Sequence, residues 1–435
     1  MTARADVALE ALAAEFRSRF PAWATTPRTV GREAEFTVVT AQGRAADCAH
    51  LWPDLLGVPG ARPLFDQPAP DGTRLSIGAE TDRWFCVAEV GRGTVEVGVG
   101  PRISLHDLGH DLASALGPLL GAARNRGWRV LGYGIQPKTP ATRSLMTPKR
   151  RYLEFLDVLG PSWLRFGLTA SDQLQCALGR DELVPAMNAV NAMSGALIAL
   201  SANSSVYGGR LGAFASGREG LMRGMVAEKH RHGSVPRSFT DELDYVRWVA
   251  AFRCLVLPDG RGGFRRPGVP YAEVAAREGP VFEDFSYHEH YLWPSARPRS
   301  RLGTLEVRPA CQQPQASTSI GALTLGIVEG REEVLKFVEE VGWPELLAYR
   351  GRAVREGLRA AEPVPAFLDT LLNLARSGLR SRGLREEPYL DELRERAERR
   401  RGPADAAHDA FIRGGVRELV EETAIVRDRP VPPDV

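Results

Sequence analysis

Two carboxylates lie close together on a short segment that is predicted to form a β-strand. Glu33 and Glu35 are two residues apart, and the residues that follow, Phe36-Thr-Val-Val39, are β-branched or aromatic. Because side chains alternate across a strand, both glutamates point to the same face. Two like charges on one face favour one of two arrangements, either an edge strand exposed to water or a cation held between the carboxylates.

A second pair of carboxylates lies in a predicted hairpin over residues 84–99. If Arg92-Gly93 forms a two-residue turn, Glu89 and Glu96 lie directly opposite each other on one face. Such a like-charge pair across two strands is destabilising by itself. A three-residue turn would shift the register and separate the two carboxylates, and the sequence leaves both arrangements open.

Two further predicted strands repeat this pattern of polar side chains on one face. Gln173 and Gln175 share a face of one strand, and Glu306 and Arg308 share a face of another. If all four regions belong to one antiparallel sheet, one of its faces is lined with carboxylates and the other packs against helices. An oxygen-rich cluster of this kind suits Mg²⁺ or Mn²⁺.

Arginines are predicted to lie at the rim of this carboxylate-lined face. Arg218, Arg297 and Arg308 would supply the positive charge that holds ATP and a carboxylate substrate. The sequence has no GxxxxGK[ST] motif and no GxGxxG motif between a strand and a helix. ATP would therefore be held through metal ions and arginines and not by a phosphate-binding loop.

The composition is that of a folded protein with a near-neutral surface. The 435 residues are 43% hydrophobic and carry a net charge of +2, which argues against a dedicated nucleic-acid binder. The five cysteines include no CxxC pair, and no signal-peptide pattern or apolar run of about 18 residues occurs. We expect a cytoplasmic monomer or homodimer that acts on small molecules, without nucleic-acid or membrane partners.

Helical periodicity accounts for much of the remaining chain, especially its C-terminal part. Helices are predicted at residues 5–20, 105–126, 148–159, 185–202, 317–341, 344–361, 364–378, 388–400 and 403–424. The tail after Arg427 is rich in proline and is expected to be loose. We predict a catalytic core over residues 1–325 and a helical region over residues 326–435, packed together as one structural unit.

The order of several short motifs resembles the glutamate–cysteine ligase family, in particular its plant-type and actinobacterial branch with the carboxylate–amine ligases. The motifs are GREAEF, AEVGRGTVEVGVGP, GYGIQP, RRY, TASDQLQ, ALSANSSVYGGRLGAFASGR and LWPSARPRSRLGTLEVRPACQQP. Each motif alone is weak, but seven in the same order are a specific signal. The similarity covers residues 28–320 and extends into the helical region.

The resemblance implies an α+β fold of the glutamine synthetase type, in which a curved antiparallel sheet forms a funnel for ATP and two or three Mg²⁺ ions. It also implies a reaction in which the γ-carboxyl of glutamate is phosphorylated and an amine then attacks the acyl phosphate. Residues matched to the family's motifs are Glu33, Glu35, Glu89, Glu96, Gln175 and Glu306 as metal ligands, Gln173, Asn203 and Arg218 as ATP-binding residues, and Arg297 and Arg308 as catalytic residues.

Two positions depart from the family's pattern. Gln175 stands where relatives have His or Asn, and Cys311 stands where relatives commonly have Asp. These departures keep two alternatives open. One is a carboxylate–amine ligase with an acceptor other than cysteine, and the other is a non-catalytic relative that binds a nucleotide or an amino acid.

Two aromatic features admit more than one interpretation. His288 and His290, on an expected strand, are either a zinc pair or residues at a solvent-exposed rim. Trp293 either forms a wall of the site or packs in the core.

Overall fold

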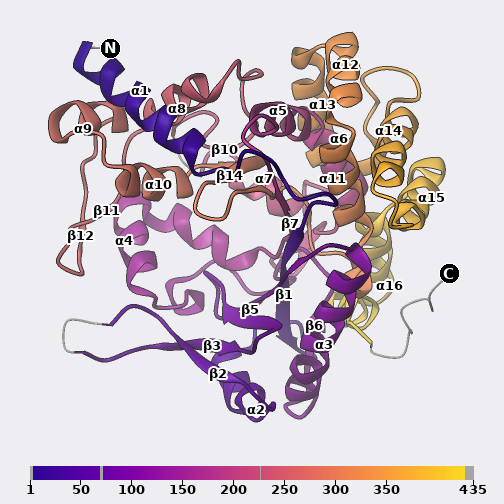
Figure 1. Ribbon diagram of the computed structural model, residues 1–435. Helices are drawn as coiled ribbons and strands as arrows, with labels where there is room; N and C mark the ends of the chain where they lie inside the picture. Colours follow the sequence, from indigo (N-terminus) through magenta and orange to yellow (C-terminus); the bar gives the residue numbers. More distant parts are fainter. Residues whose placement is uncertain (1–2, 69–71, 226, 427–435) are drawn as a thin grey trace.

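One large antiparallel sheet organises the computed structural model, which describes residues 3–68, 72–225 and 227–426 (Figure 1). Its strands are β1 (Val30–Thr40), β2 (Arg62–Phe65), β3 (Ser76–Glu80), β4 (Trp84–Ala88), β5 (Thr94–Arg102), β6 (Trp128–Leu131), β7 (Asp172–Ala177), β14 (Ala296–Arg299) and β15 (Thr304–Val307). Their order is β14-β15-β7-β1-β5-β4-β3-β2, β6 also pairs with β1, and all pairs are antiparallel. The predicted α+β class is confirmed.

The four polar strand regions of the sequence lie side by side in this sheet. β1 pairs with β5 on one side and with β7 on the other, and β7 pairs with β15. Ala34 and Phe36 alternate with the two glutamates of β1 and are fully buried in the main core. The helices α3 (Leu105–Arg124) and α11 (Ser319–Glu329) pack against strands of the sheet, so the glutamates are left for its other face.

Shorter elements surround the sheet in the first three quarters of the chain. These are α1 (Ala3–Ser18), α2 (Trp52–Leu56), α4 (Arg150–Leu159), α5 (Leu183–Ala192), α6 (Ser194–Ser201), α7 (Gly217–Met222), α8 (Glu242–Ala250), α9 (Tyr271–Glu278) and α10 (Phe282–His290). Three two-stranded pairs join β8 (Val206–Tyr207) to β9 (Arg210–Leu211), β10 (His232–Gly233) to β13 (Trp293–Pro294), and β11 (Leu257–Pro258) to β12 (Phe264–Arg265).

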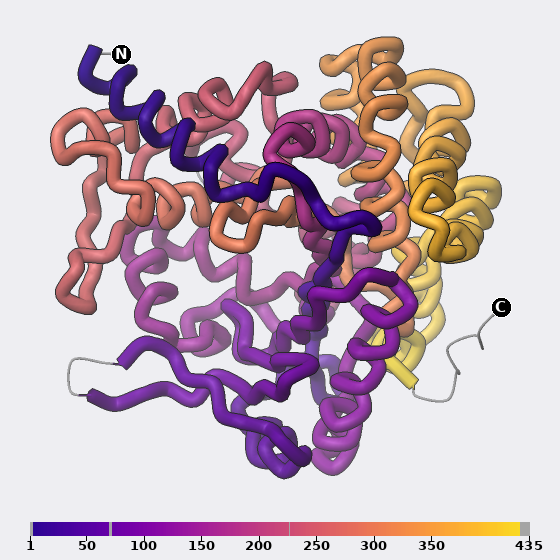
Figure 2. The backbone as a smooth tube through the Cα atoms, viewed as in Figure 1, coloured from indigo at the N-terminus to yellow at the C-terminus, as the bar shows by residue number. Residues whose placement is uncertain are grey.

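The C-terminal part is helical, as predicted, and Figure 2 shows it in orange and yellow along one side of the molecule. After α11 come α12 (Arg331–Val341), α13 (Trp343–Glu356), α14 (Phe367–Ser381), α15 (Asp391–Arg399) and α16 (Pro403–Thr423). α12 packs on α5, α13 packs on α6, and α11 packs on β7 and α14. The division of the chain at residue 325 stays a prediction, and that residue lies inside α11.

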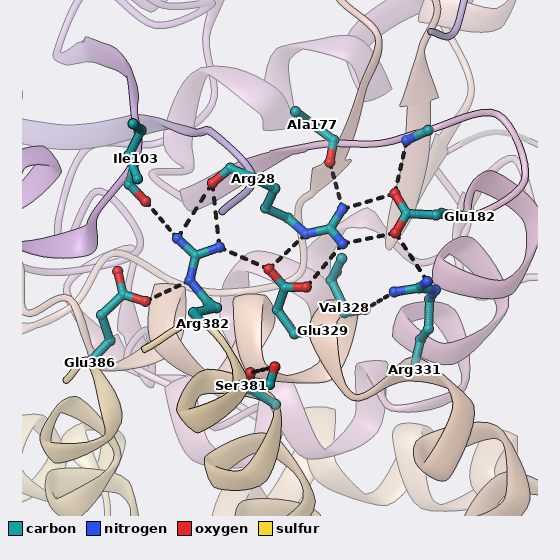
Figure 3. Close-up of polar contacts among 12 residues, drawn as sticks. Arg28, Ile103, Ala177, Glu182, Val328, Glu329, Arg331, Ser381, Arg382 and Glu386 are labelled. Carbon is teal, nitrogen blue, oxygen red and sulfur yellow. Dashed lines mark hydrogen bonds and ion pairs between the residues drawn. The ribbon is translucent and has the colours of Figure 1, made fainter. Parts of the chain in front are cut away.

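A buried network of ion pairs joins these helices to the start of β1 (Figure 3). Arg28, two residues before β1, donates to Glu182 at 3.0 Å and to Glu329 at 2.9 Å. Arg382, the residue that follows α14, donates to Glu329 at 2.8 Å and to Glu386 at 2.7 Å. Removing one partner of a buried ion pair leaves an uncompensated charge. The network therefore fixes α11 and α14 against the sheet.

Neither predicted turn of the 84–99 hairpin is present. β4 and β5 pair Val87 with Glu96, and the Glu89 N–H donates to the Thr94 carbonyl at 3.0 Å, which leaves a four-residue connection. The connection is wide because neighbouring segments hold it: the Arg92 N–H donates to the Leu145 carbonyl at 2.7 Å. Glu89 is therefore offset by two residues from Glu96 and does not face it.

Other predicted boundaries also need correction. The segment of His288 and His290 is the helix α10 and not a strand. The helix predicted at 185–202 is two helices that meet at Met193 with a bend of 50°, and the one at 317–341 is interrupted at Gly330. Within the described residues, no single helix is long and apolar enough to cross a membrane, and only this bent pair meets the criteria jointly. The predicted loose tail lies outside the described residues.

Candidate active site

A cavity of about 270 Å³ lies over the polar face of the sheet. Its acidic lining residues are Glu33, Glu35, Glu89 and Glu96, and its basic ones include Lys149, Arg151, Arg218, Arg297, Arg299 and Arg308. Its aromatic wall includes Tyr152, Trp163, Phe166, Tyr291 and Trp293. The cavity thus brings together charges of both signs from strands and loops that are far apart in the sequence.

Three carboxylates converge at the floor of this cavity. The register between β1 and β5 places Glu35 directly opposite Glu96. One oxygen from each of Glu35, Glu89 and Glu96 lies within 4.8 Å of the other two. Glu35 is held in place by the Ser171 N–H at 2.7 Å and by the Gln173 amide at 2.9 Å. Glu96 was predicted to face Glu89 within the hairpin. In the structure it faces Glu35 of the neighbouring strand β1 instead.

The protein compensates these charges poorly. Burial, together with the nearby Glu306 carboxylate, raises the pKa of Glu33 to about 7. Burial and Glu89 raise the pKa of Glu35 to about 7. Burial and the neighbouring glutamates raise the pKa of Glu96 well above its usual value. Burial and mutual repulsion thus outweigh the neighbouring arginines, and a bound cation would favour the ionised form of these carboxylates.

The donor set fits a hard divalent cation. Mg²⁺ binds oxygen ligands at about 2.1 Å, so two ligands on opposite sides of the ion lie roughly 4.2 Å apart. The 4.8 Å spread of the oxygens of Glu35, Glu89 and Glu96 comes close to this distance without a change of the backbone. All three donors are carboxylates. Mg²⁺ and Mn²⁺ prefer such oxygen ligands over the softer sulfur ligands that other metals favour.

Glu306 is surrounded by arginines and does not line the cavity. Arg297 donates to its two oxygens at 3.0 and 3.2 Å, and Arg299 and Arg308 also donate to it. Burial alone would raise the pKa of Glu306, but the three guanidinium groups outweigh burial and hold it well below its usual value. Glu306 therefore orients the arginines, and its predicted role as a metal ligand stays a prediction.

Three other residues singled out in the sequence lie beside the cavity or behind it. Gln175 donates to Glu33 and accepts from the Thr304 hydroxyl at 2.9 Å. Asn203 donates to the Gly132 and Gln312 carbonyls at 2.7 and 2.8 Å and does not line the cavity. Cys311 is buried, with its Sγ 3.2 Å from the hydroxyl of Ser204. The predicted roles of Gln175 and Asn203 stay predictions.

The arginines predicted at the rim do line the cavity, each in a defined position. Arg308 donates to the Gln173 side chain at 2.8 Å and so spans from Glu306 toward Glu35. Arg218, in the first turn of α7, donates through Nη1 to Glu219 at 2.7 Å. Its Nε is buried without a hydrogen-bond partner, which leaves a donor available for an anion.

Lys149 and Arg151 are functional candidates that the sequence analysis did not assign. Lys149 Nζ donates to the Ala88 carbonyl at 2.5 Å, and burial lowers the pKa of Lys149. Arg151 lies over the Tyr152 ring at 5.1 Å. Among the described residues, neither forms an ion pair with a carboxylate. The signal for Lys149 was its rarity, because the chain has only four lysines among 56 basic residues.

The aromatic features resolve into separate roles. His290 lines the cavity, whereas His288 has its Nε2 3.0 Å from the Val249 carbonyl and stacks on Tyr271. The two histidines therefore do not converge on a metal site. Trp293 lines the cavity and also packs on Phe166, with ring centroids 5.0 Å apart, so both of its interpretations hold.

Comparisons with known proteins point in one direction. The model of a family described as glutamate–cysteine ligase family 2 matches residues 29–422. A Rubrobacter xylanophilus protein named "Putative glutamate--cysteine ligase 2-3" is 27% identical over 346 residues, which are 78% of each chain. The crystal structure of a Francisella tularensis glutamate–cysteine ligase in complex with AMP shares the fold, with a TM-score of 0.52 and 9% identity over 92% of this chain and 88% of that one.

A larger enzyme also aligns along this chain. A bifunctional glutathione synthetase from Pasteurella multocida matches with a TM-score of 0.47 and 12% identity. The match covers 96% of this chain and 52% of that protein, so this chain spans about half its length.

Proposed function

The chain belongs to glutamate–cysteine ligase family 2, and on this premise we propose that it is an ATP- and Mg²⁺-dependent ligase. It would activate the γ-carboxyl of glutamate and join it to an amino group, with ADP and phosphate as the other products. The observation that carries this proposal is the close approach of Glu35, Glu89 and Glu96, facing arginines across one cavity. The proposal includes a fold of the glutamine synthetase type, in which the antiparallel sheet forms the floor of the site.

The reaction has two steps that balance without a redox partner. A γ-carboxylate oxygen of glutamate attacks the γ-phosphorus of ATP, and the bond to ADP breaks with its electron pair on the ADP oxygen. The amine nitrogen then attacks the acyl carbon, and phosphate leaves with the electrons of the broken C–O bond. The proton of the amine goes to a carboxylate of the site or to the leaving phosphate.

Positioning and charge stabilisation account for most of the catalysis in phosphoryl transfer. Arg297 and Arg308, fixed by Glu306, would bind the transferring phosphoryl group. Arg218 has an Nε without a hydrogen-bond partner, and Lys149 donates to a backbone carbonyl and not to a described carboxylate. Both side chains would bind anionic groups of the substrates. Trp163 and Trp293 would limit the access of water to the acyl phosphate.

Divalent ions would be held by Glu35, Glu89 and Glu96, with Glu33 beside them. Bound there, Mg²⁺ would offset the charge of the β- and γ-phosphates. The predicted contributions of Gln175 and Glu306 to metal binding belong to the same proposal. So do the predicted contributions of Gln173 and Asn203 to ATP binding.

A coupled assay of ADP release tests the proposal, with MgATP, glutamate and a panel of amino acids and amines that includes cysteine. The wild type should release ADP only when glutamate and an acceptor are both present, and the panel identifies the acceptor. Glu35→Gln should lower kcat roughly 100-fold or more, because the cluster loses one of its three charges. Glu10→Gln, an exposed change on α1, is the control. Glutamate-independent ADP release, or full activity of Glu35→Gln, would show that the assignment is wrong.

A further inference from the structure

A chain of charged side chains leads from the cavity to the C-terminal helices. Arg218 Nη1 donates to Glu219 Oε1 at 2.7 Å, and Arg350 Nη2 of α13 donates to Glu219 Oε2 at 2.5 Å. The side chains of Arg218, Glu219 and Arg350 are 8%, 4% and 12% exposed. Water therefore contributes little to the solvation of Glu219, and the two guanidinium groups share its charge.

Only one of the two arginines reaches the cavity. Arg218 lines the cavity and keeps a buried Nε without a partner. Arg350 lies behind it and lines a separate cavity of about 540 Å³ together with Glu219. Arg350 does not line the cavity over the sheet. Its Nη2 also donates to the Ser295 hydroxyl at 3.4 Å, but Glu219 is the residue that connects it to Arg218.

The backbone connects the same elements. The Ala215 N–H donates to the Arg355 carbonyl at 2.9 Å, and the Ser216 N–H donates to the Val354 carbonyl at 3.1 Å. The C-terminal end of α13 therefore holds the segment that leads into α7 and Arg218. Together with Ser204, whose hydroxyl accepts from the Arg218 N–H at 3.1 Å, α13 therefore helps to place the Arg218 side chain.

The charge of Glu219 is set by the same neighbours. Burial alone would raise the pKa of Glu219, but His232, Arg350 and Arg218 outweigh burial and lower it. The carboxylate is therefore an anion that needs its partners. A carboxylate and a guanidinium group prefer two parallel hydrogen bonds when nothing else competes for the oxygens.

We propose that Arg350 is a positioning residue for the substrate-binding role of Arg218. By occupying one oxygen of Glu219, Arg350 prevents that carboxylate from binding Arg218 through both oxygens, and so keeps donors of Arg218 free for an anionic group of the substrate. The identity of that substrate, glutamate or ATP, rests on the proposed function. The inference goes beyond that function because it gives the C-terminal helices a part in substrate binding.

Steady-state kinetics of Arg350→Met and Arg350→Lys test this role. Arg350→Met should raise the KM of one anionic substrate, glutamate or ATP, roughly 10- to 100-fold, because a charge-assisted hydrogen bond is lost. The KM of the acceptor amine and kcat should change less than about threefold. Arg350→Lys keeps one donor for Glu219 and should stay close to the wild type. Arg355→Met, on the same helix with a half-exposed side chain, is the matched control.

A double variant separates positioning from stability. In Arg350→Met/Glu219→Gln the competing carboxylate is gone, so the KM should return most of the way to the wild-type value. If Arg350 only stabilises the fold, Arg350→Met lowers the unfolding temperature and kcat without a selective change in KM. In that case the double variant changes stability while the KM of every substrate stays near the wild-type value in both variants, and the proposal is overturned.

Crystal structures of the wild type and of Arg350→Met test the positioning role of Arg350 independently of activity. Glu219 should turn in the variant and bind Arg218 through both oxygens. An unmoved Glu219, with Arg218 as in the wild type, would overturn the inference even if the protein is an active ligase. If the wild type shows no ADP release with any acceptor, the proposed function fails, and the two structures alone decide the role of Arg350.

Discussion

Replacing Glu35 with glutamine should inactivate the protein and at the same time make its metal-free form more stable. Glu35 is 8% exposed, and burial with Glu89 raises its pKa to about 7 from a usual value of 4.5. A carboxyl whose folded pKa is raised contributes stability below its unfolded pKa and loses it as the pH rises through the folded pKa. The metal-free protein therefore loses stability as the pH rises from about 4.5 to 7, because Glu35 ionises more readily in the unfolded chain than in the folded protein.

The magnitude follows from the size of this pKa difference. A folded pKa of about 7 against 4.5 makes the ionisation of Glu35 at pH 8 unfavourable by about 3 kcal/mol. Glutamine removes the charge, but its NH₂ group then faces another donor, either the Ser171 N–H or the Gln173 NH₂ group. The hydrogen bond lost in this way costs about 1 kcal/mol. The net gain in the free energy of unfolding at pH 8 should be about 2 kcal/mol. At pH 5 it should be close to zero or slightly negative.

Urea unfolding at pH 5 and pH 8, with EDTA present, measures this difference. Glu10→Gln, which removes an exposed charge on α1, should change neither value. Added Mg²⁺ should stabilise the wild type at pH 8 and stabilise Glu35→Gln much less. A loss of stability in Glu35→Gln at pH 8 would refute the reasoning, because Glu35 would then be well compensated by the protein itself.

Three further perturbations follow from the same geometry. Mg²⁺ should raise the unfolding temperature of the wild type more at pH 8 than at pH 5, because Glu33 and Glu35 are ionised only at the higher pH; equal shifts in thermal scans would contradict this. Glu306→Gln should lower the free energy of unfolding by roughly 3–5 kcal/mol, because the buried Arg297 and the partly buried Arg299 and Arg308 lose their shared anion; an unchanged value in urea unfolding would contradict this. Lys149→Met should keep the fold but raise the KM of glutamate or ATP about tenfold, and steady-state kinetics with unaltered constants would exclude a substrate contact.

Alternation of side chains explains why the floor of the site was predictable. In β1, Glu33 and Glu35 alternate with the apolar Ala34 and Phe36, and a period of two fixes which residues share a face. The same rule placed Gln173 on the face of Glu35, where the two side chains meet at 2.9 Å. Local patterning therefore identified the polar face without knowledge of the strand order.

The rest of the site depends on contacts between distant segments, which local patterns do not encode. The hairpin turn was mispredicted because its width is set by a hydrogen bond from Arg92 to Leu145. The metal-ligand role of Glu306 stays a prediction, and the strand pattern did not show that Arg297 and Arg299 of β14 and Arg308, just after β15, would all pair with it. Lys149 lies just before α4, and only the tertiary fold places it at the cavity.

Isotope transfer from glutamate to phosphate reports directly on an acyl-phosphate intermediate. Glutamate labelled with ¹⁸O in its γ-carboxyl group is incubated with MgATP and the acceptor found in the ADP assay, and the released phosphate is analysed by mass spectrometry. We expect one ¹⁸O atom in each released phosphate, with ADP as the nucleotide product. Phosphate without the label, or AMP with pyrophosphate, would contradict activation of the γ-carboxyl as an acyl phosphate.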